Sequence, residues 1–167
     1  MKTHEAILSL GSNQGDRLAC LKRAGLELLS LPETRCAAIS PVYETEPVGV
    51  PPEFAGQHFL NCVVIVETGL APHDFSSHIH AIEERLGRTR GDTPNRPRTI
   101  DIDIVTFGDL CSASPALTLP HPRARERRFV LQPLADLRPD FVFPGDTKPV
   151  SALLSALPPD PRVSRID

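Results

Sequence analysis

The segment Phe59-Leu-Asn-Cys-Val-Val-Ile-Val-Glu-Thr68 predicts the centre of the fold. It is a nearly continuous apolar run rich in β-branched residues, which is typical of a strand buried on both faces. Downstream, Pro72 opens a segment that Gly87 ends, and its periodicity predicts an amphipathic helix. The apolar residues of that helix recur at helical spacing, at Phe75, Ile79, Ile82 and Leu86.

The segments on either side complete a pattern of alternating strands and helices. In chain order the other expected elements are a strand at 5–11, a helix at 16–31, an extended segment at 35–46, a strand at 99–107, a short strand at 117–119 and helices at 129–137 and 150–157. The order β-α-β-β-α-β is the split βαβ pattern. We therefore predict an α+β fold, a ferredoxin-like two-layer sandwich with an antiparallel-type sheet and its helices packed on one face.

Length and composition limit the class of protein. At 167 residues the chain can bury a core without metal or disulfide staples, and we predict a single domain over 1–167. A net charge of −3 gives no reason to expect a nucleic acid as partner. No signal peptide or membrane span is visible, so we expect a cytoplasmic protein with no membrane partner. We also expect a monomer. Four widely spaced cysteines without a C-x-x-C pair agree with this: Cys20, Cys36, Cys62 and Cys111.

Two carboxylates on one strand are the sharpest chemical feature of the sequence. Asp101 and Asp103 alternate with isoleucines, so both side chains project from the same side of the expected strand. Neighbouring carboxylates repel unless a cation lies between them, and Mg²⁺ binds one or two carboxylates together with phosphate oxygens. An acidic, solvated sheet face is the alternative for this D-x-D pattern taken alone.

Arginines favour the metal interpretation. Nine of the fifteen arginines fall in two stretches, 85–98 and 123–128, and the planar guanidinium suits phosphate recognition. The sequence has no P-loop, and Gly11-Ser-Asn-Gln-Gly15 is interpreted as a strand-to-helix turn. His121 lies between two prolines on a stiff backbone, which favours a fixed contact with a ligand. Acids beside arginines describe a site for a nucleotide polyphosphate.

Six short motifs, in order and at suitable spacing, make the chain resemble the 6-hydroxymethyl-7,8-dihydropterin pyrophosphokinase family almost from end to end. They are Leu10-Gly-Ser-Asn13, Ser40-Pro-Val-Tyr-Glu-Thr-Glu-Pro47, Phe59-Leu-Asn61, Pro97-Arg-Thr-Ile-Asp-Ile-Asp-Ile104, Pro120-His-Pro122 and Arg127-Arg-Phe-Val-Leu-Gln-Pro-Leu134. The resemblance implies transfer of pyrophosphate from ATP to the pterin alcohol, two Mg²⁺ ions as cofactor, and AMP and the pterin diphosphate as products.

The resemblance also assigns roles by position. Asp101 and Asp103 resemble the metal ligands and, with Arg88 and Arg98, the catalytic residues. The residues that resemble nucleotide contacts are Glu83, Arg90, Arg98, Ile104, Thr118, His121 and Arg127. The residues that resemble pterin contacts are Thr45, Val48, Phe59, Asn61 and Phe129, with the two phenylalanines expected to sandwich the flat heterocycle.

The chain departs from the family pattern at a few positions, and other functions stay open. Pro94-Asn95 stands where the family often has an arginine and an aromatic residue, and Ala116 replaces a basic nucleotide contact. A catalytically impaired relative is therefore one alternative. A ligand-sensing module would bind nucleotide without releasing AMP. An RNA-binding module would need exposed aromatics, and only 5% of the residues are aromatic.

Overall fold

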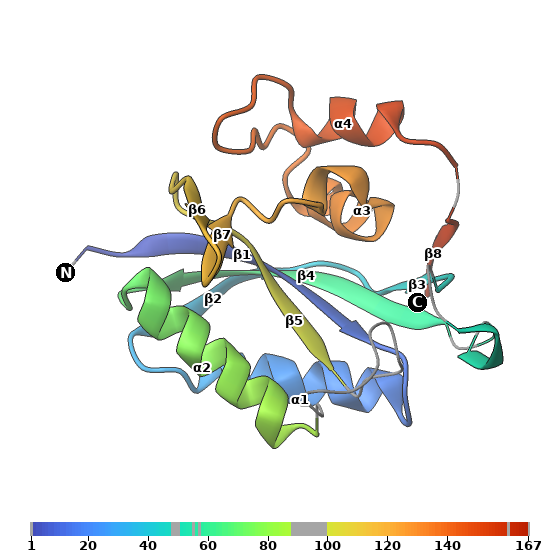
Figure 1. Cartoon of the computed structure of the whole chain (residues 1–167), viewed down its shortest axis with the longest axis horizontal. Coiled ribbons are helices and arrows are strands. Elements are labelled where there is room, and N and C mark those ends of the chain that lie inside the picture. The colour runs from blue at the N-terminus through green and yellow to red at the C-terminus, as the bar shows by residue number, and fades with distance from the viewer. Residues whose placement is uncertain are drawn as a thin grey trace.

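The middle layer of the molecule is a six-stranded sheet in which every pairing is antiparallel (Figure 1). The computed structural model describes residues 2–47, 51–54, 56, 58–87, 100–159 and 161–166. The strands of this sheet are β1 (His4–Ser12), β2 (Thr34–Ile39), β3 (Tyr43–Thr45), β4 (Phe59–Thr68), β5 (Asp101–Phe107) and β8 (Val163–Arg165). The segment 59–68 is thus the strand β4 predicted from its sequence.

Strand β4 lies at the centre of the sheet, as its apolar sequence predicts. It pairs with β1 along all of β1, from Ser12 opposite Leu60 to His4 opposite Thr68. Its other edge is shared by β3 and β2, and β5 pairs with the far edge of β1. When β2 and β3 are counted as one broken strand, the order reproduces the split βαβ pattern, so the predicted α+β fold with an antiparallel sheet is confirmed.

The break between β2 and β3 interrupts what the sequence predicts as one extended segment. At the break, Ser40 donates its backbone N–H to the Val63 carbonyl at 2.9 Å, and its Oγ accepts the Val63 N–H at 2.8 Å. The next residue, Pro41, has no N–H to continue the ladder. The chain therefore stays beside β4 while it changes from one strand to the next.

Two helices, α1 (Arg17–Leu29) and α2 (Pro72–Arg85), cover one face of the sheet (Figure 1). Asp16 caps α1, since its carboxylate accepts the Ala19 N–H at 3.1 Å, and α2 begins at Pro72. Alternate residues of the strands pack against these helices in one apolar cluster. The sheet residues of that cluster include Leu8, Leu10, Leu60, Val64, Ile102 and Ile104.

The expectation that helices pack on one face alone is corrected by a second helical layer, formed by α3 (Arg128–Leu137) and α4 (Val150–Ala156) (Figure 1). The strands β1 and β4 are apolar on both faces, so their other face also needs cover. Ile7, Val63 and Ile65 pack there in a separate cluster with the helical residues Val130, Leu131, Leu134 and Val150. A short hairpin of β6 (Ser112–Ser114) and β7 (Leu117–Leu119) leads toward this layer, followed by a 3-10 turn at Ala124–Glu126. None of the helices in the described ranges is long and apolar enough to cross a membrane.

Gly25 offers a test of the helical layer. It lies inside α1, and a Cβ added there would meet no atom within 4 Å apart from the surrounding backbone of its own helix. Gly25→Ala is therefore expected to raise the free energy of unfolding by about 0.5–1 kcal/mol, because alanine loses less backbone entropy in a helix. Urea denaturation followed by circular dichroism measures the change. A lower stability would contradict the packing described for this helix.

Candidate active site

A row of residues crosses the sheet on the face covered by α3. Asp101 of β5 lies opposite Gly11 of β1, Gly11 lies opposite Asn61 of β4, and Asn61 lies opposite Tyr43 of β3. Their sequence neighbours Leu10, Leu60 and Ile102 belong to the cluster on the other face. Adjacent strands are about 4.8 Å apart, so Asp101 and Asn61 are separated by roughly 10 Å across the sheet.

The predicted carboxylate pair forms one end of this row. Asp101 and Asp103 are both partly buried, and they project from the same face because Ile102 and Ile104 enter the opposite core. The Oδ2 atom of Asp103 lies 4.0 Å from His121 Nε2 and 3.8 Å from Arg127 Nη1. These contacts bring together an acid, an imidazole and a guanidinium, three of the residues that the sequence predicts for the site.

His121 is held in one orientation by the backbone around it. Its own N–H donates to the Val105 carbonyl of β5 at 2.8 Å, and its Nδ1 accepts the Arg123 N–H at 3.2 Å. Burial, and then the charge of Arg127, lower the pKa of His121, although Asp101 acts in the opposite sense. A neutral ring whose Nδ1 accepts must carry its proton on Nε2, so a hydrogen-bond donor is directed toward Asp103.

Two buried polar side chains, Asn61 in the row and Thr45 beside it in β3, have oxygen atoms without partners in the described part of the chain. Asn61 and Thr45 are 4% and 3% exposed, and within the described ranges Asn61 Oδ1 and Thr45 Oγ1 have no hydrogen-bond partner. A Cβ added to Gly11 would lie 2.8 Å from Asn61 Nδ2, so the Asn61 amide lies directly over this glycine. Buried polar atoms without partners are costly, and a bound polar ligand would satisfy them.

Two phenylalanines lie on the same side of the molecule as these polar groups. Phe59 begins β4 in register with Thr45 of β3, and it shares the α3-facing side of β4 with Asn61. Phe129 lies in the first turn of α3, where it packs against the second core cluster. The Arg127 guanidinium stacks on the Phe129 ring at 5.3 Å from the ring centroid. Arg127 thus touches both the carboxylate end and the aromatic part of the site.

Other predicted site residues lie farther from this row. Glu83 is 1% exposed, and its Oε2 accepts the Ile102 N–H at 2.8 Å, so it fixes β5 between the two aspartates. The side chain of Ile104 points into the opposite core. Thr118 is exposed on β7 and donates to the Ser114 carbonyl at 3.0 Å. The nucleotide contacts proposed for these three residues stay predictions. Val48, Arg88, Arg90, Arg98 and the departure at Pro94-Asn95 lie outside the described residues.

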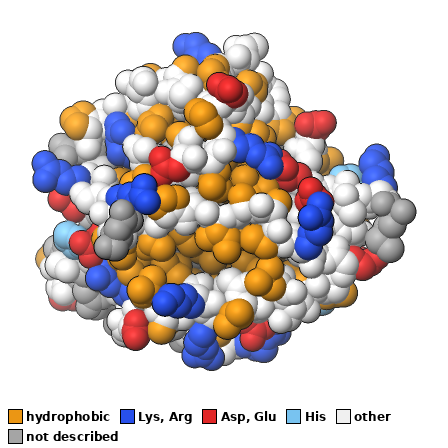
Figure 2. Space-filling model, turned by 180° about the vertical axis from the view of Figure 1, so that it is seen from behind, with side chains coloured by type: hydrophobic (Ala, Val, Ile, Leu, Met, Phe, Trp, Pro, Cys, Tyr) orange, Lys and Arg blue, Asp and Glu red, His pale blue; other side chains and the backbone are white. Residues whose placement is uncertain are grey.

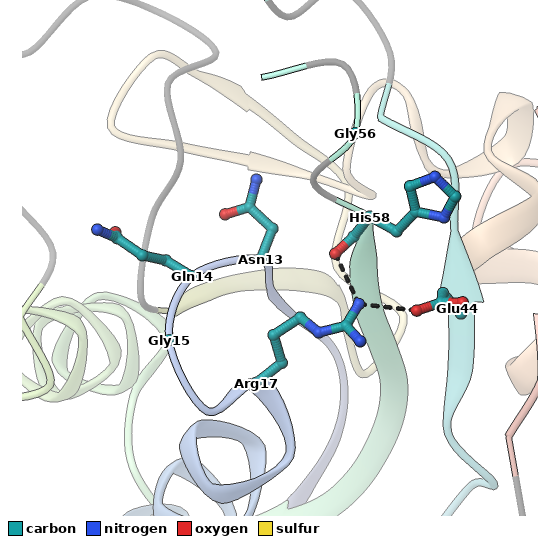
Figure 3. Close-up of a pocket in the computed structure, with 7 residues that line it drawn as sticks. All are labelled: Asn13, Gln14, Gly15, Arg17, Glu44, Gly56 and His58. Carbon is teal, nitrogen blue, oxygen red and sulfur yellow. Dashed lines mark hydrogen bonds and ion pairs between the residues drawn. The ribbon is translucent and has the colours of Figure 1, made fainter. Parts of the chain in front are cut away.

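A cavity of about 460 Å³ opens at the end of β1, and neither Asp101 nor Asp103 lines it (Figure 3). It is lined by Asn13, Gln14, Gly15, Arg17, Glu44, Gly56 and His58, none of which the sequence predicts as a site residue. The first lining residues belong to the glycine-flanked turn after β1, interpreted from sequence as a connection only. Within the described ranges, no group of three or more His, Cys, Asp or Glu could hold a metal ion.

The carboxylates beside a histidine and an arginine, on an antiparallel α+β fold, suit an enzyme that transfers phosphate-containing groups. The chain belongs to the family described as 7,8-dihydro-6-hydroxymethylpterin-pyrophosphokinase (HPPK), whose profile matches residues 7–139. The resemblance of the sequence motifs to this family is thereby confirmed.

Curated relatives agree with this assignment, and a solved structure shares the fold. The chain is 40% identical over 151 residues to the 2-amino-4-hydroxy-6-hydroxymethyldihydropteridine pyrophosphokinase of Pseudomonas aeruginosa, covering 90% of each protein. It is 41% identical over 142 residues to the protein of that name from Methylorubrum extorquens, covering 85% of this chain and 87% of the relative. In structure it is similar to the wild-type HPPK-DHPS of Plasmodium falciparum, with a TM-score of 0.72 over 92% of this chain and 44% of that one, at 16% identity.

Proposed function

We propose that the protein transfers a pyrophosphoryl group from ATP to 6-hydroxymethyl-7,8-dihydropterin, giving AMP and the pterin diphosphate in folate biosynthesis. Membership of the HPPK family is the observation that carries the proposal. The relatives from Pseudomonas aeruginosa and Methylorubrum extorquens are named for this activity and match most of the chain. The cross-sheet row supports it, because a polar slot and a carboxylate pair lie about two strand spacings apart.

The pterin is proposed to bind at the end of the row that contains Asn61. The Oδ1 of Asn61 and the Oγ1 of Thr45 are buried without partners among the described residues, and the amide edge of a pterin offers N–H donors to such oxygens. Asn61 and Thr45 line this end of the row, which we call the pterin slot, and Gly11 leaves the sheet surface flat below it. Phe59 and Phe129 supply aromatic faces for the heterocycle, with Val48 as a further contact outside the described residues.

The triphosphate is proposed to bind at the opposite end, with Mg²⁺ between it and the two aspartates. The donor set fits this ion, because two partly exposed carboxylates leave the remaining coordination positions to phosphate oxygens and water. When bound, Mg²⁺ would neutralise phosphate charge and polarise the phosphoryl oxygens. Arg127 and the neutral Nε2–H of His121 flank Asp103 and would donate to phosphate oxygens. Arg88, Arg90 and Arg98 are proposed to add further positive charge.

The reaction is proposed as an in-line displacement. The hydroxymethyl oxygen of the pterin attacks the β-phosphorus of ATP, the bond from that phosphorus to the bridging oxygen of the α-phosphate breaks, and AMP leaves with the bond's electrons. The alcohol proton passes to solvent. The contribution of the chain is to hold the two substrates at a fixed separation and to offset charge on the phosphoryl oxygens, so positioning and electrostatics dominate catalysis.

Release of AMP tests this function directly. With ATP and Mg²⁺, the protein is expected to form AMP only when the pterin alcohol is present, and a chelator is expected to stop the reaction. Nucleotide binding without AMP, in the presence of the pterin, would instead indicate the ligand-sensing module. A very slow release of AMP, which becomes faster when Asn95 is replaced by the aromatic residue usual in the family, would indicate a catalytically impaired relative.

Location and assembly are part of the same proposal. We place the protein in the cytoplasm as a monomer, with residues 1–167 acting as one catalytic domain. All four cysteines lie in the described part of the chain and none of them forms a disulfide, which suits a reducing compartment. Size-exclusion chromatography with light scattering would test the monomer.

A further inference from the structure

Arg17 joins three segments at the end of the sheet where the pterin is proposed to bind. Its Nη1 donates to the Glu44 carboxylate at 2.8 Å and to the His58 carbonyl at 2.9 Å (Figure 3). Arg17 begins α1, Glu44 lies in β3, and His58 immediately precedes β4. Its side chain is 33% exposed and that of Glu44 is 37% exposed, so water only partly screens the pair.

The position of this arginine is not explained by the stability of its own helix. Arg17 is the first residue of α1, where unpaired backbone N–H groups give the helix a partial positive charge. A cation there is unfavourable, and acidic residues are preferred. The arginine is therefore held against the helix dipole by its contacts with Glu44 and His58.

Both acceptors are sequence neighbours of proposed pterin contacts. Glu44 precedes Thr45, whose hydroxyl is buried without a partner among the described residues. His58 precedes Phe59, which pairs in register with Thr45. The Nη1 atom of Arg17 thus binds the side chain of the residue before Thr45 and the backbone carbonyl of the residue before Phe59. The contacts lie on the rim of the cavity of about 460 Å³, beside the turn after β1.

We propose that Arg17 is a positioning residue for the pterin slot, which rests on the function proposed above. It ties the start of α1 to the middle of β3 and to the residue before β4. This contact supports the placement of the Phe59 ring beside the Thr45 hydroxyl, whose strands are paired there. Without this contact, Glu44 loses its cation and the His58 carbonyl loses a donor, so the slot is no longer preformed and must be ordered by the ligand. The nucleotide end of the row does not depend on this contact.

The test compares binding of the two substrates to Arg17→Met, which keeps the side-chain stem and removes the donors. Calorimetry with a non-hydrolysable ATP analogue and Mg²⁺ present is expected to show the Kd for the pterin alcohol raised about tenfold. The Kd for the ATP analogue is expected to stay within about twofold of wild type. Arg17→Lys, which retains a donor, is expected to recover part of the pterin affinity. The KM for pterin should rise in parallel, with kcat at saturating pterin changed much less.

Arg35→Met is the matched control. Arg35 forms an ion pair with Glu67 across β2 and β4, at the opposite end of β4 from Phe59. Arg35→Met is expected to leave the Kd for the pterin alcohol and the Kd for the ATP analogue unchanged. Urea denaturation of each variant separates a loss of folded protein from a loss of affinity.

The outcomes separate the inference from the function on which it rests. An unchanged pterin Kd in Arg17→Met, or an equal weakening of pterin and nucleotide binding, would overturn the positioning role while wild-type AMP formation stands. Wild-type protein that forms no AMP and binds no pterin would overturn the proposed function and the inference together.

Discussion

Asp103→Ala is expected to lower kcat for AMP formation by about a thousandfold or more, and Asp101→Ala by a similar factor. Both carboxylates project from β5 toward the α3 side of the sheet, and Asp103 lies within 4.0 Å of His121 and 3.8 Å of Arg127. Without either acid, the cluster becomes more positive and offers a divalent cation one ligand fewer. The triphosphate then loses the cation that would hold it in line with the alcohol.

The free energy of unfolding and a variant of the nearby Asp109 provide the controls for this experiment. Both aspartates are partly exposed, so their replacement is expected to change the free energy of unfolding by no more than about 1 kcal/mol. Asp109→Ala removes an exposed carboxylate just after β5 and should leave kcat unchanged. Single-turnover kinetics at saturating ATP and Mg²⁺ measure the effect. Turnover close to wild type in both active-site variants would remove the basis for the metal site.

Asn61→Ala is expected to raise the Kd for the pterin alcohol by about a hundredfold, with little change in nucleotide affinity. Asn61 is 4% exposed, and its Oδ1 has no partner within the described ranges. If this oxygen reads the pterin, its loss leaves buried groups of the ligand without hydrogen bonds, which is more costly than the loss of an exposed contact. Equilibrium binding of the pterin in the presence of an ATP analogue measures the effect.

Gly11→Ala is expected to displace the Asn61 side chain without changing that residue. A Cβ at Gly11 would lie 2.8 Å from Asn61 Nδ2, so the amide must move away from its position above β1. The pterin Kd is expected to rise although Asn61 itself is unchanged. Gly25→Ala, a glycine replacement with open space around it, should leave pterin binding unaffected. Wild-type pterin affinity in both Asn61→Ala and Gly11→Ala would argue that the pterin binds elsewhere.

Local periodicity explains why much of the fold could be predicted. The apolar run of β4 and the alternation in β5 are signals within single segments, and each corresponds to a strand. The helix signals at Asp16 and Pro72 are local as well, and α1 and α2 begin there. The two aspartates share one face for the same reason, since strand geometry alone requires it.

Contacts between distant segments could not be predicted in this way. The strand β8 is three residues long and pairs with β3 far upstream, so its own sequence carries little signal. The second helical layer depends on both faces of β1 and β4 being apolar, and a single run does not show which helix covers which face. The environment of Tyr43 is long-range as well, because its hydroxyl donates a hydrogen bond to Asp136 of α3, 93 residues away. Burial, and then this hydrogen bond, raise the pKa of Tyr43 to about 12.

The candidate site also combines residues that the sequence predicts with contacts that only the structure shows. Resemblance to the family predicts Asn61 and Thr45 as pterin contacts, but only the register of the sheet shows that Gly11 lies between Asn61 and Asp101. Arg17 was missed, because its partners Glu44 and His58 are 27 and 41 residues away in the sequence. An arginine at the start of a helix is a weak signal that could have drawn attention to it.

Anomalous diffraction from crystals grown with Mn²⁺ and a non-hydrolysable ATP analogue tests the central claim most directly. The account predicts peaks at the manganese edge within about 2.5 Å of carboxylate oxygens from both Asp101 and Asp103, each peak also touching phosphate oxygens of the nucleotide. Peaks at other positions, with the nucleotide bound and both carboxylates surrounded by water, would contradict it.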